Sequence, residues 1–551
     1  FMKRFIVVIL LVLGWNTASS QNKSTSANGS KTERPKLVVG IVVDQMRWDF
    51  LYRFYNLYSP KGGIRRMLDN GYSCENTFTP YAPTITAPGH ATAYTGSVPA
   101  IHGITGNAWW DSQLNRSVYC VEDNTVKTVG NTSTAGEMSP RNMLTTTITD
   151  ELRMSSNFKS KVVAVAIKDR GAILPAGHSA NAAYWYDASK GNFITSTYYM
   201  NDLPEWVKNF NDRKVVDSLY ELNWNLALKT KTYNEYATDD VKPYEGKPFG
   251  QDATGFPYNL AKFIGKDYSK ISSTPHGNSL IFEMAKAALQ NEQLGKSGAT
   301  DFLAVSLSSP DYVGHSFGPN SWETLDTYIR LDESLGKFFD HLDATVGKGQ
   351  YISFFTADHG VAHVPGFLKE NKLPGGTFDD VLVMREMNTI LKQKFGREGL
   401  IVSMYNYQVH LNNRIIDSLK LDRYGITTLI TNYLQKQESV ARVFEIQNLS
   451  VTTINSKQRE MLANGYYPSR GGDIQIILKP GYIDGGPTGT THGLWNPYDS
   501  HIPLVWYGWN IKPGKLHRET YMTDIAPTLA AMLQIQMPNG TVGTVIQEVV
   551  K

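Results

Sequence analysis

Six residues that could bind metal ions gather at a few points along the chain. Five follow apolar runs and one lies in a glycine-rich loop: Asp44, Asp311, His315, Asp358, His359 and His492. Carboxylate and imidazole groups together suit zinc. Six ligands suffice for two zinc ions with three protein ligands each, which leaves positions open for a substrate. Two ions about 3.5–4 Å apart can clamp the attacking and leaving oxygens of a phosphoryl transfer.

The spacing of these residues is compatible with such a site. Asp311 and His315 are four positions apart, so one helical turn after a strand would place both on one face. Asp358 and His359 are adjacent, and neighbours at a strand end can diverge toward two bridged ions. Each piece alone is a weak signal. Together, in this order, they predict a metal centre.

A threonine stands just before an expected helix in "YAPTITAPGHATAYTGS". Pro88 is suited to the first position of a helix, because its missing N–H is not needed there. Thr86 would then precede a helix N-terminus, whose free N–H groups attract anions. A hydroxyl beside a metal ion can be deprotonated and attack phosphorus. The alternative is that Thr86 only caps the helix; the neighbouring metal ligands favour the nucleophile.

Four apolar runs indicate the elements that position these residues. They are rich in β-branched residues and continuous rather than alternating: "KLVVGIVVDQM", "KVVAVAIKDR", "DFLAVSLSSPDYVGH" and "QYISFFTADHG". Such runs are typical of central strands in a parallel sheet that is covered on both faces. Each ends at polar residues, and ligands bind beyond the carboxyl ends of parallel strands. The sequence therefore predicts an α/β fold with a mostly parallel central sheet and one shared site.

Helical patterns and two less regular regions lie between these runs. The segment 321–346 predicts a helix capped by Ser321, and 522–535 predicts one capped by Thr523 with Pro527 in its first turn. Residues 171–276 are rich in Tyr, Trp and Asn and are interpreted as an insertion over the sheet edge. Residues 365–481 are interpreted as an inserted α+β cap subdomain. Its expected helices are 379–394 and 421–435, and its expected strands are 400–411, 441–446 and 473–480.

The composition is that of an ordinary globular protein with a large core, 41% hydrophobic and 19% charged. The net charge of +3 comes without a block of like charge, so no nucleic-acid partner is expected. Two cysteines, Cys74 and Cys120, are too few for a disulfide framework, and whether they pair is left open.

The beginning of the sequence resembles a secretory signal peptide. Lys3 and Arg4 precede an apolar run from Phe5 to Leu13, and small residues follow. A buried strand is the alternative. We interpret 1–20 as the signal peptide, 21–35 as a disordered spacer and 36–551 as the catalytic domain. No later apolar run approaches about 18 residues, so no membrane segment is expected after the signal is removed. The expected location is outside the cytoplasm, in the periplasm or secreted.

Taken together, these motifs resemble the alkaline phosphatase superfamily. They are most similar to phosphate-irrepressible bacterial alkaline phosphatases that use a threonine nucleophile. The segments that carry the resemblance extend from Lys36 to the C-terminal helix: "VVDQMRWD", "PTITAPGHATAYTGSVPAIHGITGNAWWD", "KDRGAILPAGH", "SSPDYVGHSFGP", "TADHGVAH" and "GTTHGLWNPYDSHIPL". The resemblance implies a three-layer core with a central sheet flanked by helices. It also implies hydrolysis of small phosphate monoesters through a covalent phosphothreonine at Thr86.

The resemblance also implies a role for each ligand. One zinc ion, on the side of the leaving group, would be held by Asp311, His315 and His492. The other, which activates Thr86, would be held by Asp44, Asp358 and His359. Five further histidines lie close to the motifs, and none is expected to bind metal directly; most are expected to support the ligands or the structure: His90, His102, His178, His363 and His501.

Three more residues would contact the phosphoryl group. By resemblance, Asn107 donates to one oxygen, while Lys168 and Arg170 reach the others. Asp169, between them, has no role in this pattern and is expected either to orient one of the two cations or to face solvent. A phosphate monoester carries two negative charges and a diester carries one. A lysine and an arginine at one strand end therefore favour a monoesterase.

A phosphodiesterase or nucleotide pyrophosphatase on the same fold stays the alternative. A sulfatase is disfavoured, because Cys74 is not in a Cys-x-Pro-x-Arg setting. A non-catalytic binding protein would not need the full ligand set together with Thr86. The natural substrate and the oligomeric state are left open.

Overall fold

The computed structural model describes residues 33–550. The predicted signal peptide, residues 1–20, lies outside the described residues, as does the predicted spacer, residues 21–35, except for its last three positions. From Pro35 onward the chain forms one compact unit. Within the described range, no helix combines the length and the apolar character that crossing a membrane requires.

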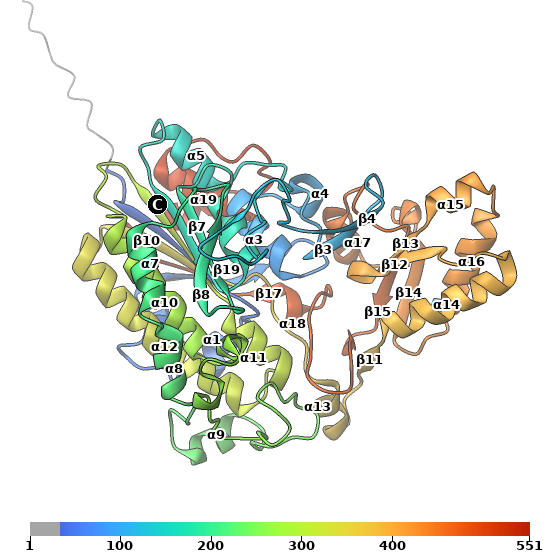
Figure 1. The fold of residues 1–551 in the computed structure, drawn as a ribbon, viewed down its shortest axis with the longest axis horizontal. Coiled ribbons are helices and arrows are strands. Elements are labelled where there is room, and N and C mark those ends of the chain that lie inside the picture. The colour runs from blue at the N-terminus through green and yellow to red at the C-terminus, as the bar shows by residue number, and fades with distance from the viewer. Residues whose placement is uncertain (1–32, 551) are drawn as a thin grey trace, which may run out of the picture. The chain divides into compact units, whose positions relative to one another are not determined.

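An eleven-stranded sheet forms the centre of this unit (Figure 1). The four apolar runs form β1 (Leu37–Val43), β6 (Val162–Ala166), β9 (Asp301–Leu307) and β10 (Tyr351–Thr356). They are neighbours in the order β10-β1-β9-β6, and each pairs with the next in parallel. Every residue in these strands is buried. The predicted buried, parallel centre is therefore confirmed.

Toward its edges the sheet becomes antiparallel. On one side β7 (Ala182–Asp187) is parallel to β6, but β8 (Asn192–Ser196) is antiparallel to β7. On the other side β18 (Leu504–Gly508) is antiparallel to both β10 and β2 (Tyr72–Phe78). Because β7 and β8 lie within 171–276, part of this predicted insertion belongs to the central sheet itself.

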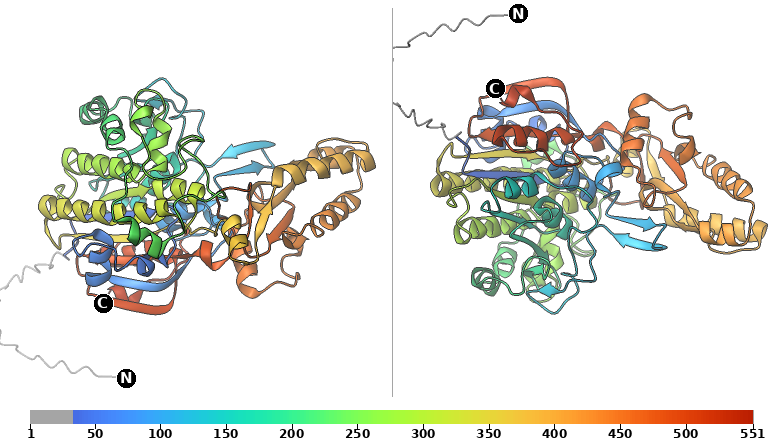
Figure 2. Two further views of the ribbon diagram at one scale, coloured as in Figure 1. Left: turned by 90° about the horizontal axis from the view of Figure 1, so that it is seen from below. Right: turned by 90° about the horizontal axis from the view of Figure 1, so that it is seen from above.

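Helices cover both faces of the sheet (Figure 2). One group consists of α2 (Gly63–Asn70), α10 (His276–Asn291) and α12 (Trp322–Leu342). The other consists of α3 (Thr86–Thr95), α5 (Ile148–Ser155), α6 (Asp169–Ala176) and α19 (Ile525–Leu533). These three layers are the fold that the sequence predicted.

The predicted helix caps have different outcomes. Ser321 caps α12, since its side chain accepts a hydrogen bond from the Thr324 N–H. The prediction that Thr523 caps the C-terminal helix is wrong. A 3₁₀ turn, Met522–Asp524, precedes α19, and the Asp524 carboxylate accepts from the Tyr521 N–H at 2.9 Å. A carboxylate three residues after Tyr521 closes this turn and moves the start of the helix beyond Thr523.

Residues 365–481, which we call the cap unit, have the predicted α+β composition. A sheet with the order β12-β13-β15-β14 packs against α14 (Asp380–Phe395) and α16 (Arg423–Leu434) around a separate apolar core. The strands are β12 (Ile401–Ser403), β13 (Gln408–Leu411), β14 (Val440–Glu445) and β15 (Ile474–Leu478). The predicted strand 400–411 is broken by a 3₁₀ turn, Tyr405–Tyr407. There Asn406 and Tyr407 have left-handed backbones, with φ of 60° and 61°.

The two cysteines do not pair. Cys74 and Cys120 are both free and buried. Burial raises the pKa of Cys74 to about 12, and that of Cys120 rises for the same reason. Both thiols are therefore protonated at neutral pH, as expected for structural cysteines.

Candidate active site

Parallel strands bring the predicted carboxylates to one edge of the sheet. Asp44 directly follows β1, and its N–H donates to the carbonyl of Leu307, the last residue of β9, at 3.1 Å. Asp311 lies in the first turn of α11 (Ser309–Phe317), which follows β9. Asp358 comes two residues after the end of β10. Because these strands are neighbours and point the same way, the three carboxylates meet in the interior.

All six predicted ligands lie in one cluster. Candidate ligand atoms of Asp44, Asp358 and His359 lie within 4.8 Å of one another, as do those of Asp311, His359 and His492. His315 Nε2 lies 3.1 Å from Asp311 Oδ1, one helical turn away as predicted. His359 thus reaches both groups, whereas the resemblance assigned it to one only.

The three histidines present the same ring nitrogen to this cluster. Each places Nδ1 at hydrogen-bond distance from a backbone carbonyl oxygen: 2.8 Å for His315, 2.9 Å for His359 and 2.7 Å for His492. A neutral ring that donates through Nδ1 keeps a lone pair on Nε2, which is how metal-binding histidines are commonly oriented. Burial lowers the pKa of His359 to about 3 and also lowers that of His492, so both rings are neutral.

The carboxylates also fit divalent cations. Asp44 Oδ1 and Asp358 Oδ2 are buried and have no hydrogen-bond partner among residues 33–550. A buried carboxylate oxygen without a donor is costly, and it is an atom that a metal ion readily takes. Burial, together with Asp311 and Asp358, raises the pKa of Asp44 well above its usual range. This region therefore needs positive charge, and the donor set suits metal ions.

Thr86 lies at the start of α3 and is only 1% exposed. The expectation that Pro88 begins the helix is wrong, because α3 starts two residues earlier at Thr86. Proline is tolerated there because N–H groups throughout the first turn lack intrahelical partners. The cap position belongs to Ile85, so Thr86 is not a capping residue. Its hydroxyl lies 3.5 Å from both His359 Nε2 and Lys168 Nζ.

Lys168 lies among the carboxylates. Its ammonium is 2.7 Å from Asp44 Oδ2 and 2.6 Å from Asp311 Oδ2. Burial opposes its charge, but Asp311 and Asp44 outweigh this effect and raise the pKa of Lys168. The lysine therefore stays cationic beside the Thr86 hydroxyl.

Asn107 is oriented by the helix that carries Thr86. The Ala87 N–H donates to Asn107 Oδ1 at 3.0 Å. This contact uses the amide oxygen and leaves the Nδ2 donors, which bond to no other residue that the structure describes. Asn107 can therefore donate to an anion at the start of α3.

The cap unit contacts the segment around Asn107 and the loop that holds His492. The sequence had not indicated these contacts. Asn406 Nδ2 donates to the Ala108 carbonyl at 3.1 Å, and a Cβ atom on Gly106 would lie 2.4 Å from the same amide nitrogen. The Tyr407 hydroxyl donates to the His492 carbonyl at 3.4 Å. The 3₁₀ turn thus contacts the backbone on both sides of Asn107 and at His492.

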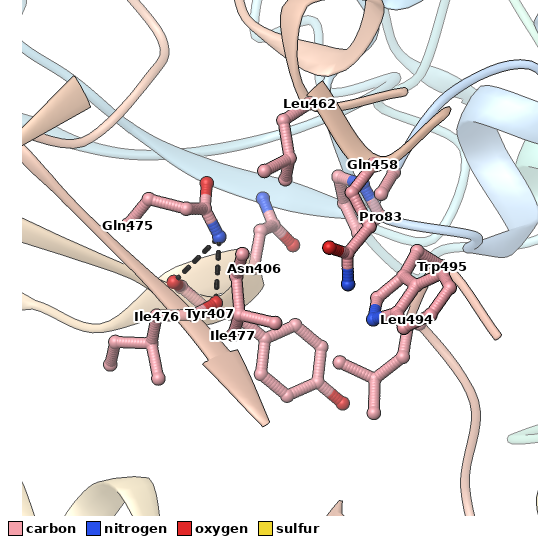
Figure 3. Close-up of a pocket in the computed structure, with 12 residues that line it drawn as sticks. Pro83, Asn406, Tyr407, Gln458, Leu462, Gln475, Ile476, Ile477, Leu494 and Trp495 are labelled. Carbon is pink, nitrogen blue, oxygen red and sulfur yellow. Dashed lines mark hydrogen bonds between the residues drawn. The ribbon is translucent and has the colours of Figure 1, made fainter. Parts of the chain in front are cut away.

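A small cavity lies beside this turn (Figure 3). Its walls include Asn406 and Tyr407 from the turn, Ile476 from β15, and Trp495 from the loop after His492. The volume of about 20 Å³ can hold a water molecule. None of the six predicted ligands lines it, so the cavity is separate from the Asp/His cluster.

The five further histidines that lie close to the motifs have partners within the protein. Each ring has at least one hydrogen-bond contact to a side chain or the backbone, and none belongs to a group that could hold a metal ion among the described residues: His90, His102, His178, His363 and His501. His90 Nδ1 lies 2.9 Å from the Thr86 carbonyl oxygen, inside α3.

Known proteins have similar sequences, and the structure of one of them is similar as well. Residues 38–498 match the family described as type I phosphodiesterase / nucleotide pyrophosphatase. Alkaline phosphatase PhoV of Synechococcus elongatus is 50% identical over 100% of both chains. Alkaline phosphatase PafA of Elizabethkingia meningoseptica is 46% identical over 100% of this chain and 99% of its own. The crystal structure of wild-type PafA superimposes with a TM-score of 0.92 at 48% identity, and covers 94% of this chain and 99% of that one.

Proposed function

Because the chain belongs to the type I phosphodiesterase / nucleotide pyrophosphatase family, within the alkaline phosphatase superfamily, we propose that it is an alkaline phosphatase. It would hydrolyse small phosphate monoesters to an alcohol and inorganic phosphate. The observation that carries this proposal is the position of the Thr86 hydroxyl. It lies at a helix N-terminus, 3.5 Å from both Lys168 Nζ and His359 Nε2, next to the Asp/His cluster.

The chemistry proceeds in two displacements at phosphorus. Thr86 Oγ1 loses its proton and attacks, an O–P bond forms, the bond to the alcohol oxygen breaks, and that oxygen takes up a proton. The product is a phosphothreonine, and water then attacks the same phosphorus and releases phosphate, which restores the hydroxyl. Lys168, Arg170 and Asn107 would hold the non-bridging oxygens, together with N–H groups at the start of α3.

We propose two zinc ions as the cofactor. Asp311, His315 and His492 would hold one, and Asp44, Asp358 and His359 the other. Bound there, the ions would lower the pKa of the Thr86 hydroxyl and offset negative charge on the leaving oxygen. The Nε2 orientation of the three histidines and the unpartnered oxygens of Asp44 and Asp358 support this assignment.

The charges around the phosphoryl site favour a monoesterase over a phosphodiesterase. Lys168 and Arg170 both follow β6, and the pKa shifts of both favour the charged form. A monoester dianion offers them one more negative charge than a diester does. A diesterase would instead need an apolar surface for the second ester group. The family description includes diesterases, so this distinction requires a direct test.

We expect the double variant Lys168→Ala, Arg170→Ala to lose about 100- to 10,000-fold in kcat/KM for an aryl phosphate monoester. Hydrogen bonds to charged groups contribute roughly 1.5–3 kcal/mol each, and 1.36 kcal/mol is a factor of ten. Hydrolysis of the matching diester should fall far less. The measurement is kcat/KM on both substrates.

The matched control is Lys161→Ala. Lys161 directly precedes the first residue of β6, whereas Lys168 and Arg170 follow the last. Its ammonium bonds to the Glu292 carbonyl, away from the candidate site. Both activities should stay near wild type in this variant. Equal losses on monoester and diester in the double variant would favour the phosphodiesterase alternative.

We also propose that the enzyme is exported, with the periplasm as its location. The sequence pattern of residues 1–20 supports this proposal. N-terminal sequencing of protein from the periplasmic fraction tests it, and a chain found only in the cytoplasm with residues 1–20 intact would contradict it.

A further inference from the structure

Arg170 contacts two residues to which the proposed reaction gives no role. Its Nη1 donates to the Tyr119 hydroxyl at 3.0 Å. That hydroxyl in turn donates to Asp169 Oδ1 at 2.6 Å. The same carboxylate oxygen accepts the backbone N–H of Arg170, also at 2.6 Å. The three side chains therefore form one connected network.

The order of donors in this network is determined by chemistry. A phenol has one hydrogen to donate, and Tyr119 gives it to the carboxylate of Asp169. The lone pairs of the hydroxyl are then left to accept from Arg170. The chain of hydrogen bonds runs from guanidinium to phenol to carboxylate, and bonds arranged in series strengthen one another.

The rest of the guanidinium stays free to bind an anion. Arg170 Nε is buried without a hydrogen-bond partner, and Nη2 donates to no residue within 33–550. The side chain is 17% exposed, so it is enclosed but not fully buried. With Nη1 committed to Tyr119, the remaining donors suit two of the non-bridging oxygens of a phosphoryl group.

Tyr119 belongs to a hairpin that also holds Asn107. It is the last residue of β4 (Arg116–Tyr119), which pairs with β3 (Ala108–Asp111). The next residue, Cys120, donates its N–H to the Asn107 carbonyl at 3.0 Å. The Tyr119 N–H donates to Glu122 Oε2 at 2.9 Å, which closes the turn after β4. The tyrosine therefore projects from a well-braced backbone toward Arg170.

We propose that Tyr119 and Asp169 are positioning residues that hold the Arg170 guanidinium in the orientation that binds the phosphoryl group. This inference rests on the proposed function, because it takes phosphate as the ligand of Arg170. Arginine has many rotamers, and ordering it before the substrate binds removes part of the entropy cost of binding. Neither residue touches the reacting atoms; both act through Arg170.

The main test is Tyr119→Phe, which removes only the hydroxyl. We expect kcat/KM for an aryl phosphate monoester to fall about 10-fold, because small misplacements of a binding group are costly. In an Arg170→Ala background the same change should have almost no further effect. The four proteins form a double-mutant cycle, which measures coupling directly.

Three further variants separate this role from general stability. Tyr55→Phe removes an equivalent bond, from the Tyr55 hydroxyl to Asp69 Oδ1 at 2.6 Å on the exposed surface, and should leave kcat/KM unchanged. Asp169→Asn keeps an oxygen that can accept from both Tyr119 and the Arg170 N–H, and should retain most activity. Asp169→Ala lacks that oxygen, so its kcat/KM should fall by about as much as that of Tyr119→Phe.

The affinity of the metal-loaded enzyme for inorganic phosphate, measured by calorimetry, completes the design. Tyr119→Phe should weaken phosphate binding only when Arg170 is present. Equal losses in both backgrounds, or no loss in either, would overturn the positioning role. A wild-type protein that binds phosphate but hydrolyses no monoester would refute the proposed function alone. In that case the phosphate affinities of the four proteins would still measure the coupling between Tyr119 and Arg170. A wild-type protein that neither binds phosphate nor hydrolyses monoesters would refute both.

Discussion

Thr86→Ala is expected to lose about 10,000-fold or more of the monoesterase kcat, while the fold and the bound metal are kept. Removal of a catalytic nucleophile has effects of this size in other hydrolases. The change deletes only the hydroxyl and one methyl group, and alanine is well suited to a helix. Because Thr86 is not a helix cap, its loss should cost little stability. Single-turnover kinetics with a labelled aryl phosphate provides the measurement.

Two companion variants make this result specific. Thr86→Ser keeps a hydroxyl and should retain much of the rate. Acid quench should trap labelled phosphate on residue 86, both in that variant and in the wild type. Thr95→Ala removes another buried threonine of α3, whose hydroxyl donates to the Ala91 carbonyl, and should leave the chemistry intact. Near-normal turnover in Thr86→Ala would rule out the covalent route.

Removal of metal should abolish activity, and added zinc should restore it. Three aspartates and three histidines gather around Thr86, so elemental analysis should find about two zinc ions per chain. A second readout is thermal stability. Stripping the ions leaves unpartnered carboxylate oxygens on Asp44 and Asp358 in the interior, so Tm should fall.

Variants of two buried aspartates sharpen this test. Asp358→Ala should lower both the zinc content and the activity. Asp332→Asn changes a buried carboxylate elsewhere, which accepts from the N–H groups of Ser59, Ile64 and Arg65, and should lower stability without changing the zinc content. Active protein that contains no transition metal would contradict the proposed cofactor.

Much of the fold followed from local sequence patterns. The β-branched runs that end at Asp44, Lys168 and Asp358 became buried parallel strands of one sheet, because continuous apolar strands must be covered on both faces. Their shared direction then brought the polar residues that follow them to one edge. This is why the cluster could be expected from residue types and their positions at strand ends.

Local signals failed where another residue competed with them. Pro88 is suited to a first helical position, yet α3 begins at Thr86, because proline is equally tolerated later in the first turn. Thr523 is a good cap, but Asp524 closes a turn with the backbone of Tyr521. The run 400–411 is apolar enough for one strand, but its left-handed turn at Asn406 interrupts it.

The sequence by itself indicated which chemical groups this protein brings together: six residues able to bind metal ions, a threonine near the start of a helix and two cations after one strand. Only the tertiary structure decided how those groups are oriented. His492 is turned by the carbonyl of Thr84, 408 positions away, and Arg170 is held by Tyr119, 51 positions away. Such contacts involve single atoms of distant segments, which leave no periodicity in the sequence. They form only when the sheet and the β3–β4 hairpin bring the segments together.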